Sequence, residues 1–220
     1  MIQKIVDKTG LTSKITRKEL DRFVINNKSN KLTLDLGCSN SPYSQYFSNR
    51  VGFDISKGKG VDVVGDAHNL PFEDEKFDNI LCTEVLEHLH TPQKAIAEMK
   101  RVLKKDGKLI LTTRFLFPLH DIPHDYYRYT KYGLRNLFKD WNIVELREEV
   151  NTIKTIAVLL QRIGYQSKLR GGKVTKVFLF LLAKLVAKLS FFVVKEYGDI
   201  GKTKKESDIM ASGYYLVAKK

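Results

Sequence analysis

The hydrophobic positions of residues 1–150 fall into short apolar runs separated by segments with helical spacing. The runs have the length of buried strands, and the segments between them place their apolar residues on one face of a helix. Strands that alternate with helices predict a doubly wound α/β fold, with a mostly parallel sheet and helices on both of its faces. The expected strands span residues 31–37, 51–55, 61–64, 77–83, 108–115, 141–150 and 212–220.

The clearest helical pattern lies between residues 91 and 107. Thr91 is expected to cap this helix, Pro92 to open it and Gly107 to follow its end, because each residue type favours that position. Another helix is expected to start in SPYSQYFS, with Ser41 as its cap. The remaining helices of this part are expected at residues 17–27 and 131–140, the latter capped by Thr130.

The composition is that of a folded protein, since 43% of the 220 residues are hydrophobic and 29% are charged. The two cysteines, Cys38 and Cys82, lie outside any zinc-binding spacing and suggest no disulfide framework. The N-terminal segment contains no uninterrupted apolar block of the kind that directs secretion. We therefore expect a cytoplasmic protein with reduced thiols, folded as one domain that spans residues 1–220.

The net charge of +13 is concentrated in one region of the chain. Residues 151–205 contain twelve basic and two acidic residues, whereas the remainder carries 26 basic and 23 acidic residues. A basic protein can bind nucleic acid, an anionic membrane or a phosphorylated substrate. The region lies between the sixth and seventh expected strands, so we expect a basic, apolar helical insertion of two helices separated by RGG.

The most apolar stretch, GGKVTKVFLFLLAKLVAKLSFFVVK, lies inside this insertion. Its longest uncharged run after Val174 has seven residues, whereas a membrane span needs about 20. On a helix from Val174 to Val194 its lysines fall in a stripe about 120° wide, and the rest of the circumference is almost wholly apolar. That pattern is typical of a helix in the interface of an anionic membrane; packing against a partner helix or a second subunit, as in a homodimer, is the alternative. The lysines in the span 173–195 are Lys173, Lys176, Lys184, Lys188 and Lys195.

Residues with candidate chemistry follow the expected strands. Gly37 begins the turn after the first strand, where a glycine lets the backbone turn tightly and approach a ligand. Asp54 ends the second strand, where a carboxylate can accept hydrogen bonds from both hydroxyls of a ribose; a helix cap is its alternative role. Asp66 follows the third strand, where a carboxylate and neighbouring amides can read the amino edge of an adenine. Ligands of such sheets bind beyond the carboxyl ends of the strands, so these residues predict a ligand site there.

Four stretches in this order, DLGCSNS, VGFDIS, GDAHNLPFEDEKFDNILCTEVLEHL and AIAEMKRVLKKDGKLIL, resemble the class I S-adenosylmethionine-dependent methyltransferases. The small-molecule, type 11-like branch is the nearest match, and the resemblance covers residues 31–140. GYYLVAKK is similar to the last, antiparallel strand of that family. The resemblance implies a Rossmann-like sheet in the order 3-2-1-4-5-7-6 and S-adenosyl-L-methionine as cofactor. A nicotinamide-binding fold is disfavoured because its glycine spacing is absent.

The resemblance also implies roles for single residues at the strand ends. The family has glycines where this chain has Ser39 and Ser41, so the shape of this turn is where the chain departs from the pattern. The implied contacts are Asp35 and Gly37 to the methionine end, Asp54 to the ribose, Asp66 and Ala67 to the adenine, and Thr83 and Glu84 to the methionine and methyl end. Ser39 and Ile55 are further candidate cofactor contacts.

The loop RFLFPLHDIPHDYYRYTKYGL after the fifth strand holds two His-Asp pairs. In the family fold this loop lies over the methyl group, and histidine suits removal of a proton from an alcohol near neutral pH. His120 and His124 are therefore the candidate general bases, although the loop could instead pack as a lid. Neighbours along an extended chain point in opposite directions, so we expect no metal site from the two pairs. The candidate substrate contacts are Tyr126, Tyr127 and Arg128.

Glu87 and His88 lie in EVLEHLH, which follows the fourth strand. We expect them at the start of a helix, with His88 held by hydrogen bonds near the cofactor rather than acting directly in catalysis.

The sequence thus predicts a methyltransferase that docks on the inner face of the membrane and methylates an amphiphilic or lipid-linked acceptor. An oxygen of a glycan or polyprenyl-linked sugar is the first choice, and carbon methylation of a quinone-like ring is the second. Nucleic-acid modification or binding is a rival, since DYYRYTKYGLRNLFKDW mixes basic and aromatic residues. No separate RNA-binding module is visible, however, and the charge lies beside the apolar helix. A non-catalytic scaffold that keeps the fold is a further alternative.

Overall fold

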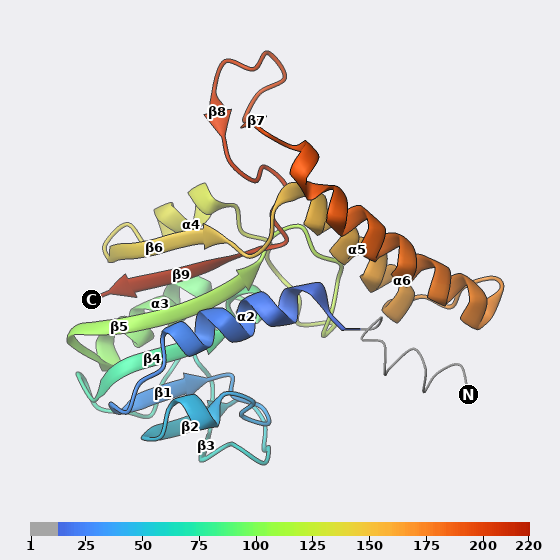
Figure 1. Cartoon of the computed structure of the whole chain (residues 1–220). Coiled ribbons are helices and arrows are strands. Elements are labelled where there is room, and N and C mark those ends of the chain that lie inside the picture. Colours follow the sequence, from blue (N-terminus) through green and yellow to red (C-terminus); the bar gives the residue numbers. More distant parts are fainter. Residues whose placement is uncertain (1–12) are drawn as a thin grey trace. The chain divides into compact units, whose positions relative to one another are not determined.

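The computed structural model describes residues 13–220, which form two compact units (Figure 1). The absence of a secretion signal was predicted largely from residues 1–12, which lie outside the described residues. The expected insertion, residues 151–205, falls within one of the units, and a single domain stays a prediction. The sheet unit comprises residues 22–115, 119–147 and 213–220, and the helical unit comprises residues 13–21, 116–118 and 148–212.

The sheet unit is built on a seven-stranded sheet. Its strands are β1 Thr33–Leu36, β2 Arg50–Asp54, β3 Val63–Val64, β4 Phe77–Thr83, β5 Leu103–Arg114, β6 Asn142–Glu148 and β9 Gly213–Lys219. Their spatial order is β3-β2-β1-β4-β5-β9-β6, which confirms the predicted topology. β9 runs antiparallel to β5, whereas β1 pairs in parallel with β2 and β4.

The central strands explain the apolar runs of the sequence. All four residues of β1 are buried, which is the pattern of a parallel strand covered on both faces. The parallel strands β1, β2 and β4 end at the same edge of the sheet. Residues that follow these strands are therefore brought together, although they lie up to 50 residues apart in the sequence.

Helices cover both faces of this sheet. They are α2 Ile15–Asn26, α3 Pro92–Val102 and α4 Lys131–Leu137. Figure 1 shows the end of α2 that belongs to the sheet unit, residues 22–26, in front of the sheet and α3 and α4 behind it. Phe23 of α2 stacks on Tyr215 of β9, with ring centroids 4.6 Å apart. The predicted cap of α4 is confirmed, because the hydroxyl of Thr130 accepts a hydrogen bond from the N–H of Gly133.

The helix predicted to start at Ser41 is wrong. That segment forms a single 3-10 turn, η1 Ser44–Tyr46. Ser41 has φ +47° instead of the extended conformation of a cap residue. Its hydroxyl accepts a hydrogen bond from Nη2 of Arg50 at 2.6 Å and donates to the carbonyl of Gly60 at 3.1 Å. These contacts hold the hydroxyl away from the backbone N–H groups that a helix cap would accept from.

The predicted boundaries of α3 are also partly wrong, because the helix ends at Val102, well before Gly107. Leu103 is fully buried, adopts an extended conformation and pairs with Phe77 of β4. Pairing in the sheet buries this side chain and satisfies its backbone, which outweighs helical periodicity. Thr91 precedes the helix but makes no capping hydrogen bond through its side chain.

The helical unit contains two long helices and a small hairpin. Its elements are α5 Thr152–Gln166, α6 Gly172–Lys188, η3 Leu189–Phe192, β7 Glu196–Tyr197 and β8 Lys205–Glu206. Two helices separated by RGG were predicted, and they are present. The prediction of one helix to Val194 is wrong, because α6 ends at Lys188 and a 3-10 turn follows. Lys195 is therefore outside the helical stripe of lysines.

α6 packs on α5 through the side of the helix that carries its lysines. Phe180 and Ala183 are buried, and the ring of Phe180 lies 4.9 Å from that of Tyr165 in α5. Nζ of Lys176 lies 6.0 Å from the centre of the Phe180 ring, so this lysine borders the contact. The exposed residues on the opposite side, which we call the apolar face of α6, are Val174, Phe178, Leu181 and Leu185. Leu189, the first residue of η3, is also exposed.

Membrane-spanning helices were not expected from the sequence. Within residues 13–220, no helix combines the length and apolar character that a membrane crossing requires.

Candidate functional site

The turn after β1 requires a glycine. Gly37 has φ +70°, which L-residues rarely adopt, and a Cβ at this position would collide with Cγ2 of Val85 in the loop after β4. The N–H groups of Gly37 and Cys38 both donate to the carbonyl of Phe53 in β2, at 2.8 and 3.2 Å. The tight turn predicted at Gly37 is thus confirmed.

The two serines that stand where the family has glycines keep a left-handed backbone. Ser39 has φ +46° and Ser41 has φ +47°, which are unusual values for residues with a side chain. The N–H of Ser39 donates to Oδ2 of Asp54 at 2.9 Å, which helps to hold the turn. The serines therefore adopt the kind of backbone conformation that glycine adopts without strain.

Asp54 lies at the end of β2, where the predicted ribose contact should be. Its carboxylate accepts from the N–H of Ser39 and, at 3.1 and 3.4 Å, from the N–H and the hydroxyl of Ser56. A carboxylate offers roughly four lone-pair sites, so capacity remains for a ligand hydroxyl. Ile55, which follows, is exposed.

Asp35 lies within β1 and is buried, in contrast to Asp54. Oδ2 of Asp35 is 3.2 Å from Nε of Arg50. Burial raises the pKa of this carboxyl to about 6, and the neighbouring guanidinium offsets part of the effect.

Asp66, which follows β3, forms a local turn with His68. Its Oδ1 accepts from the N–H of His68 at 2.9 Å and lies 2.5 Å from Nδ1 of the same residue. These hydrogen bonds hold the pKa of Asp66 below its usual range. The side chain stays 54% exposed, and Ala67 beside it is buried, so the carboxylate is accessible to a ligand.

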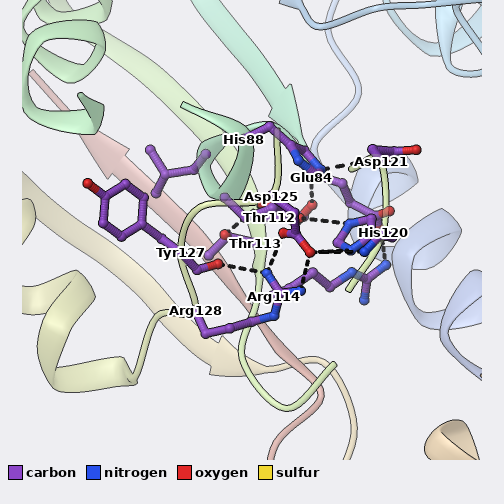
Figure 2. A network of polar contacts seen from close by, with 12 residues as sticks. Glu84, His88, Thr112, Thr113, Arg114, His120, Asp121, Asp125, Tyr127 and Arg128 are labelled. Atoms are coloured by element: carbon purple, nitrogen blue, oxygen red, sulfur yellow. Dashed lines mark hydrogen bonds and ion pairs between the residues drawn. The ribbon is translucent and has the colours of Figure 1, made fainter. Parts of the chain in front are cut away.

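Glu84, which follows β4, is held in place by residues of β5. It has φ +57°, and its N–H donates to the carbonyl and to the hydroxyl of Thr112, each at 3.1 Å. Its carboxylate forms an ion pair with Arg114 at the end of β5 (Figure 2). Thr83, the last residue of β4, is half-buried beside it. A strained backbone held by several partners is typical of functional positions.

Glu87 is fully buried in the 3-10 turn η2 Leu86–His88, so the longer helix expected to start here is wrong. Its Oε2 accepts from the hydroxyl of Thr113 at 2.8 Å. Its backbone carbonyl accepts from the N–H groups of Tyr126 and Tyr127, at 3.0 and 3.1 Å. Burial raises the pKa of the Glu87 carboxyl. Glu87 thus joins β5 to the loop over the site.

Asp125 organises that loop from inside. Its side chain is 1% exposed and forms two hydrogen bonds of 2.6 Å with the guanidinium of Arg128. This pairing holds the pKa of Asp125 at about 2. Oδ2 of Asp125 also accepts from the N–H of His120 and lies 3.4 Å from Nδ1 of that ring. Arg128, predicted to contact the acceptor, is therefore engaged by a carboxylate of the chain itself.

The second candidate base, His124, lies in a different environment from His120. His124 is exposed, and its Nδ1 is 3.1 Å from the hydroxyl of Tyr126. Its carbonyl accepts from Nδ1 of His88 at 2.7 Å, so His88 is held by a hydrogen bond, as predicted. Tyr126 and Tyr127 are both exposed, which leaves their rings available to an acceptor.

Sequence reasoning missed Arg114 and the way Glu87 is buried. Arg114 is the last residue of β5, and that position at the carboxyl end of a strand was a usable signal. No sequence signal separates the buried Glu87 from the half-buried Glu84, because both belong to the same short polar segment.

The resemblance stated from the sequence is confirmed by comparison with known proteins. Residues 34–111 match the family model described as a methyltransferase domain. A SAM-dependent methyltransferase of Thermotoga maritima shares the fold, with a TM-score of 0.58 at 15% identity over 100% of this chain and 96% of that chain.

Two curated relatives match part of the chain. An uncharacterized protein of Methanocaldococcus jannaschii is 30% identical over 135 residues, which cover 56% of this chain and 62% of that protein. The demethylmenaquinone methyltransferase of Thermobifida fusca is 29% identical over 137 residues, which cover 50% of this chain and 58% of the relative. The chain thus spans less than two thirds of the length of these relatives.

Proposed function

We propose that this chain, which carries a class I methyltransferase domain, is an S-adenosylmethionine-dependent methyltransferase acting on an amphiphilic or lipid-linked acceptor at a membrane surface. The observation that carries the methyltransferase assignment is the position of Gly37 and Asp54 at the ends of adjacent parallel strands, within the segment that matches the family model. The proposed acceptor group is a hydroxyl of a glycan or polyprenyl-linked sugar.

The residues at the carboxyl edge of the sheet fit this cofactor. Asp54 keeps acceptor capacity for one ribose hydroxyl, and the 3.4 Å hydrogen bond from the Ser56 hydroxyl can give way to the second. The exposed carboxylate of Asp66 can accept from the amino group of adenine. Gly37 carries no side chain, so the turn after β1 can approach a ligand closely. Glu84, fixed by Arg114, is the carboxylate proposed to face the methionine end.

The transfer needs alignment and the removal of one proton. The bound cofactor supplies a methyl group on a sulfonium: the acceptor oxygen forms the new O–CH₃ bond while the S–CH₃ bond breaks and its electron pair stays on sulfur. The chain holds the two reactants in line, which supplies much of the acceleration. The hydroxyl proton passes to Nε2 of His124, because this ring is exposed and its Nδ1–H can donate to the hydroxyl of Tyr126.

Docking on a membrane is supported by surfaces of the helical unit. The side chain of Phe178 on the apolar face of α6 is 59% exposed, and Phe191 and Phe192 of η3 are 70% and 68% exposed. The twelve basic and two acidic residues of the surrounding segment match an anionic lipid surface, where each lysine contributes about 1 kcal/mol. A second copy of the chain would bring the same excess of positive charge to the interface, which disfavours self-association.

A quinone-like carbon acceptor is the second candidate. It is favoured by the similarity to a demethylmenaquinone methyltransferase and would use the same docking surface. Carbon methylation of such a ring also requires loss of a proton, so the proposed role of His124 is compatible with both acceptors.

The test is transfer of a radiolabelled methyl group from S-adenosylmethionine to defined lipids in anionic vesicles. We expect label in a polyprenyl-linked sugar and none in the same sugar without its lipid. Label in a demethylated quinone instead would replace the oxygen acceptor with the carbon acceptor. Transfer to a soluble sugar at the same rate would contradict an amphiphilic acceptor.

A further inference from the structure

Three potential metal ligands converge beneath the loop over the site. Glu87, His88 and His120 each offer one ligand atom, and these atoms all lie within 4.8 Å of one another. Oε1 of Glu87 is 4.0 Å from Nε2 of His120, and the rings of the two histidines lie 4.8 Å apart, edge to face. His88 from the loop after β4 and His120 from the loop after β5 lie close together in Figure 2, so the cluster joins the two loops.

Both histidines are oriented as metal-binding histidines commonly are. Nδ1 of His88 donates to the carbonyl of His124 at 2.7 Å, and Nδ1 of His120 lies 3.4 Å from Oδ2 of the buried Asp125. A carbonyl or carboxylate at one ring nitrogen fixes the tautomer and directs the other nitrogen, here Nε2, toward a metal. Arg128 in turn holds Asp125 with two hydrogen bonds, so the orienting group is itself fixed.

Glu87 supplies an independent observation. Its side chain is fully buried, and Oε2 is satisfied by Thr113, yet Oε1 makes no hydrogen bond within the described residues. A buried carboxylate oxygen without a partner is rare in folded proteins and calls for a ligand or ion. The oxygen faces His120, which is where an ion held by the cluster would lie.

We infer that Glu87, His88 and His120 form a binding site for a divalent transition-metal ion of the manganese-to-zinc series. Two imidazoles and one carboxylate suit such ions better than Mg²⁺ or Ca²⁺, which prefer oxygen ligands. Ligand atoms of a tetrahedral site with bonds of about 2.0–2.2 Å lie roughly 3.3 Å apart, so binding draws the loop toward Glu87. The three ligands leave coordination positions open, with Oδ2 of Asp121 at 3.8 Å from Nε2 of His88.

The role of the ion rests on the proposed function. An acceptor hydroxyl bound at an open position would be acidified, because a metal ion lowers the pKa of a coordinated oxygen. Its proton would still pass to His124, and the oxygen would attack the methyl carbon as described. The site would thereby select an acceptor with a hydroxyl over one that reacts through carbon.

A second group, Asp66, His68 and His90, also places ligand atoms within 4.8 Å of one another. It is less suited to an ion, because Nδ1 of His68 contacts Asp66 and its Nε2 accepts from the N–H of Thr91 at 3.3 Å. Both ring nitrogens of His68 are thus engaged in contacts within the chain. His90, a histidine of this second group, therefore serves as the control position in the metal-binding experiment.

The experiment is a titration of Co²⁺ and of Zn²⁺ into the metal-free full chain, without cofactor or acceptor. Binding of Co²⁺ is monitored by its visible absorption, and binding of both ions is measured by calorimetry. We expect one equivalent per chain, and at least about tenfold weaker binding for Glu87→Gln and His120→Gln. His90→Gln should bind as the wild type does. Absence of one-equivalent binding, or its loss in His90→Gln alone, would overturn the site.

Two further measurements keep the outcomes distinct. The melting temperature of each metal-free variant identifies a folding failure; His88→Gln then replaces any variant that does not fold and should show the same weakening. S-adenosylmethionine binding is titrated separately, so failure of the proposed function does not affect the metal result. Metal binding without any increase in hydroxyl methylation would refute the catalytic role while leaving the site.

Discussion

Nε of Arg50 lies 3.2 Å from Oδ2 of Asp35 in the buried part of the sheet unit. Burial nevertheless raises the pKa of Asp35 from 3.8 to about 6, so the folded state binds this proton more tightly than the unfolded state. The free energy of unfolding should therefore fall as the pH rises from about 4 to about 6, by on the order of 3 kcal/mol, and then level off. Chemical denaturation of Asp35→Asn should lack this decline.

The matched comparison is the difference in stability between wild type and Asp35→Asn at each pH. Other carboxyl groups titrate in both proteins and cancel in this difference. A difference that stays constant between pH 4 and 7 would show that Arg50 cancels the effect of burial.

Gly37→Ala should destabilise the sheet unit, because the new Cβ would meet Cγ2 of Val85 and φ +70° disfavours alanine. We expect a loss of about 2 kcal/mol or more in the free energy of unfolding. Gly133→Ala is the control, since its Cβ would meet only Oγ1 of Thr130 at 3.4 Å within a helix. That variant should be stabilised by about 0.5–1 kcal/mol. Similar effects in the two variants would refute the steric account of Gly37.

His124→Gln should lower the turnover of methyl transfer by about 10²–10⁴-fold, because it removes the proposed base. The affinity for S-adenosylmethionine should not change. Tyr126→Phe removes the hydroxyl 3.1 Å from Nδ1 and should cause a smaller loss. If His124→Gln keeps wild-type turnover on the identified acceptor, the proton is removed by another group.

Replacing Phe178, Leu181 and Leu185 by serine should release the chain from anionic vesicles in a flotation assay. These side chains are exposed, so their replacement removes membrane contacts without emptying a core. Ile200→Ser is the control, because that side chain is fully exposed but lies outside α6 and η3.

The lysines provide a second test of the same surface. Lys173 and Lys188 are exposed, so exchanging both for glutamate should weaken binding to anionic vesicles and reduce its salt dependence. Retention of vesicle binding by both the serine and the glutamate variants would place docking on another surface.

The strands could be predicted because the central ones are buried along most of their length, whereas their order in the sheet was implied by the resemblance to the methyltransferases. Leu34 and Leu36 are buried on one face of β1, Thr33 and Asp35 are buried on the other, and the candidate ligand residues follow at its end. Local signals also sufficed at Thr130, where a cap residue precedes a helix and makes the expected hydrogen bond. Helix starts of this kind depend on residues that are close in the sequence.

Features that depend on distant contacts could not be predicted. α3 ends at Val102 because Leu103 pairs with Phe77, and Ser41 does not cap a helix because Arg50 and Gly60 engage its hydroxyl. Residues 189–194 contain neither glycine nor proline, so the sequence does not mark the end of α6 at Lys188.

In the candidate site, too, residues with a local sequence signal could be predicted and contacts between distant segments could not. Gly37 and Asp54 could be identified because each follows or ends a predicted strand and because the motifs around them occur together in the order of the family. The ion pair of Glu84 with Arg114 and the burial of Glu87 arise where the loop after β4 meets β5. Such relationships become visible only once the strands are adjacent.

The most direct test of the central claim is a calorimetric titration of S-adenosylmethionine into the wild type, Asp54→Ala and Ser56→Ala. We predict saturable one-to-one binding by the wild type and at least about tenfold weaker binding by Asp54→Ala, since hydrogen bonds to a charged acceptor contribute about 1.5–3 kcal/mol each. Ser56→Ala, which keeps the N–H that Asp54 accepts from, should bind normally. No measurable binding by the wild type would contradict the enzyme assignment, and unchanged affinity in Asp54→Ala would remove Asp54 from the site.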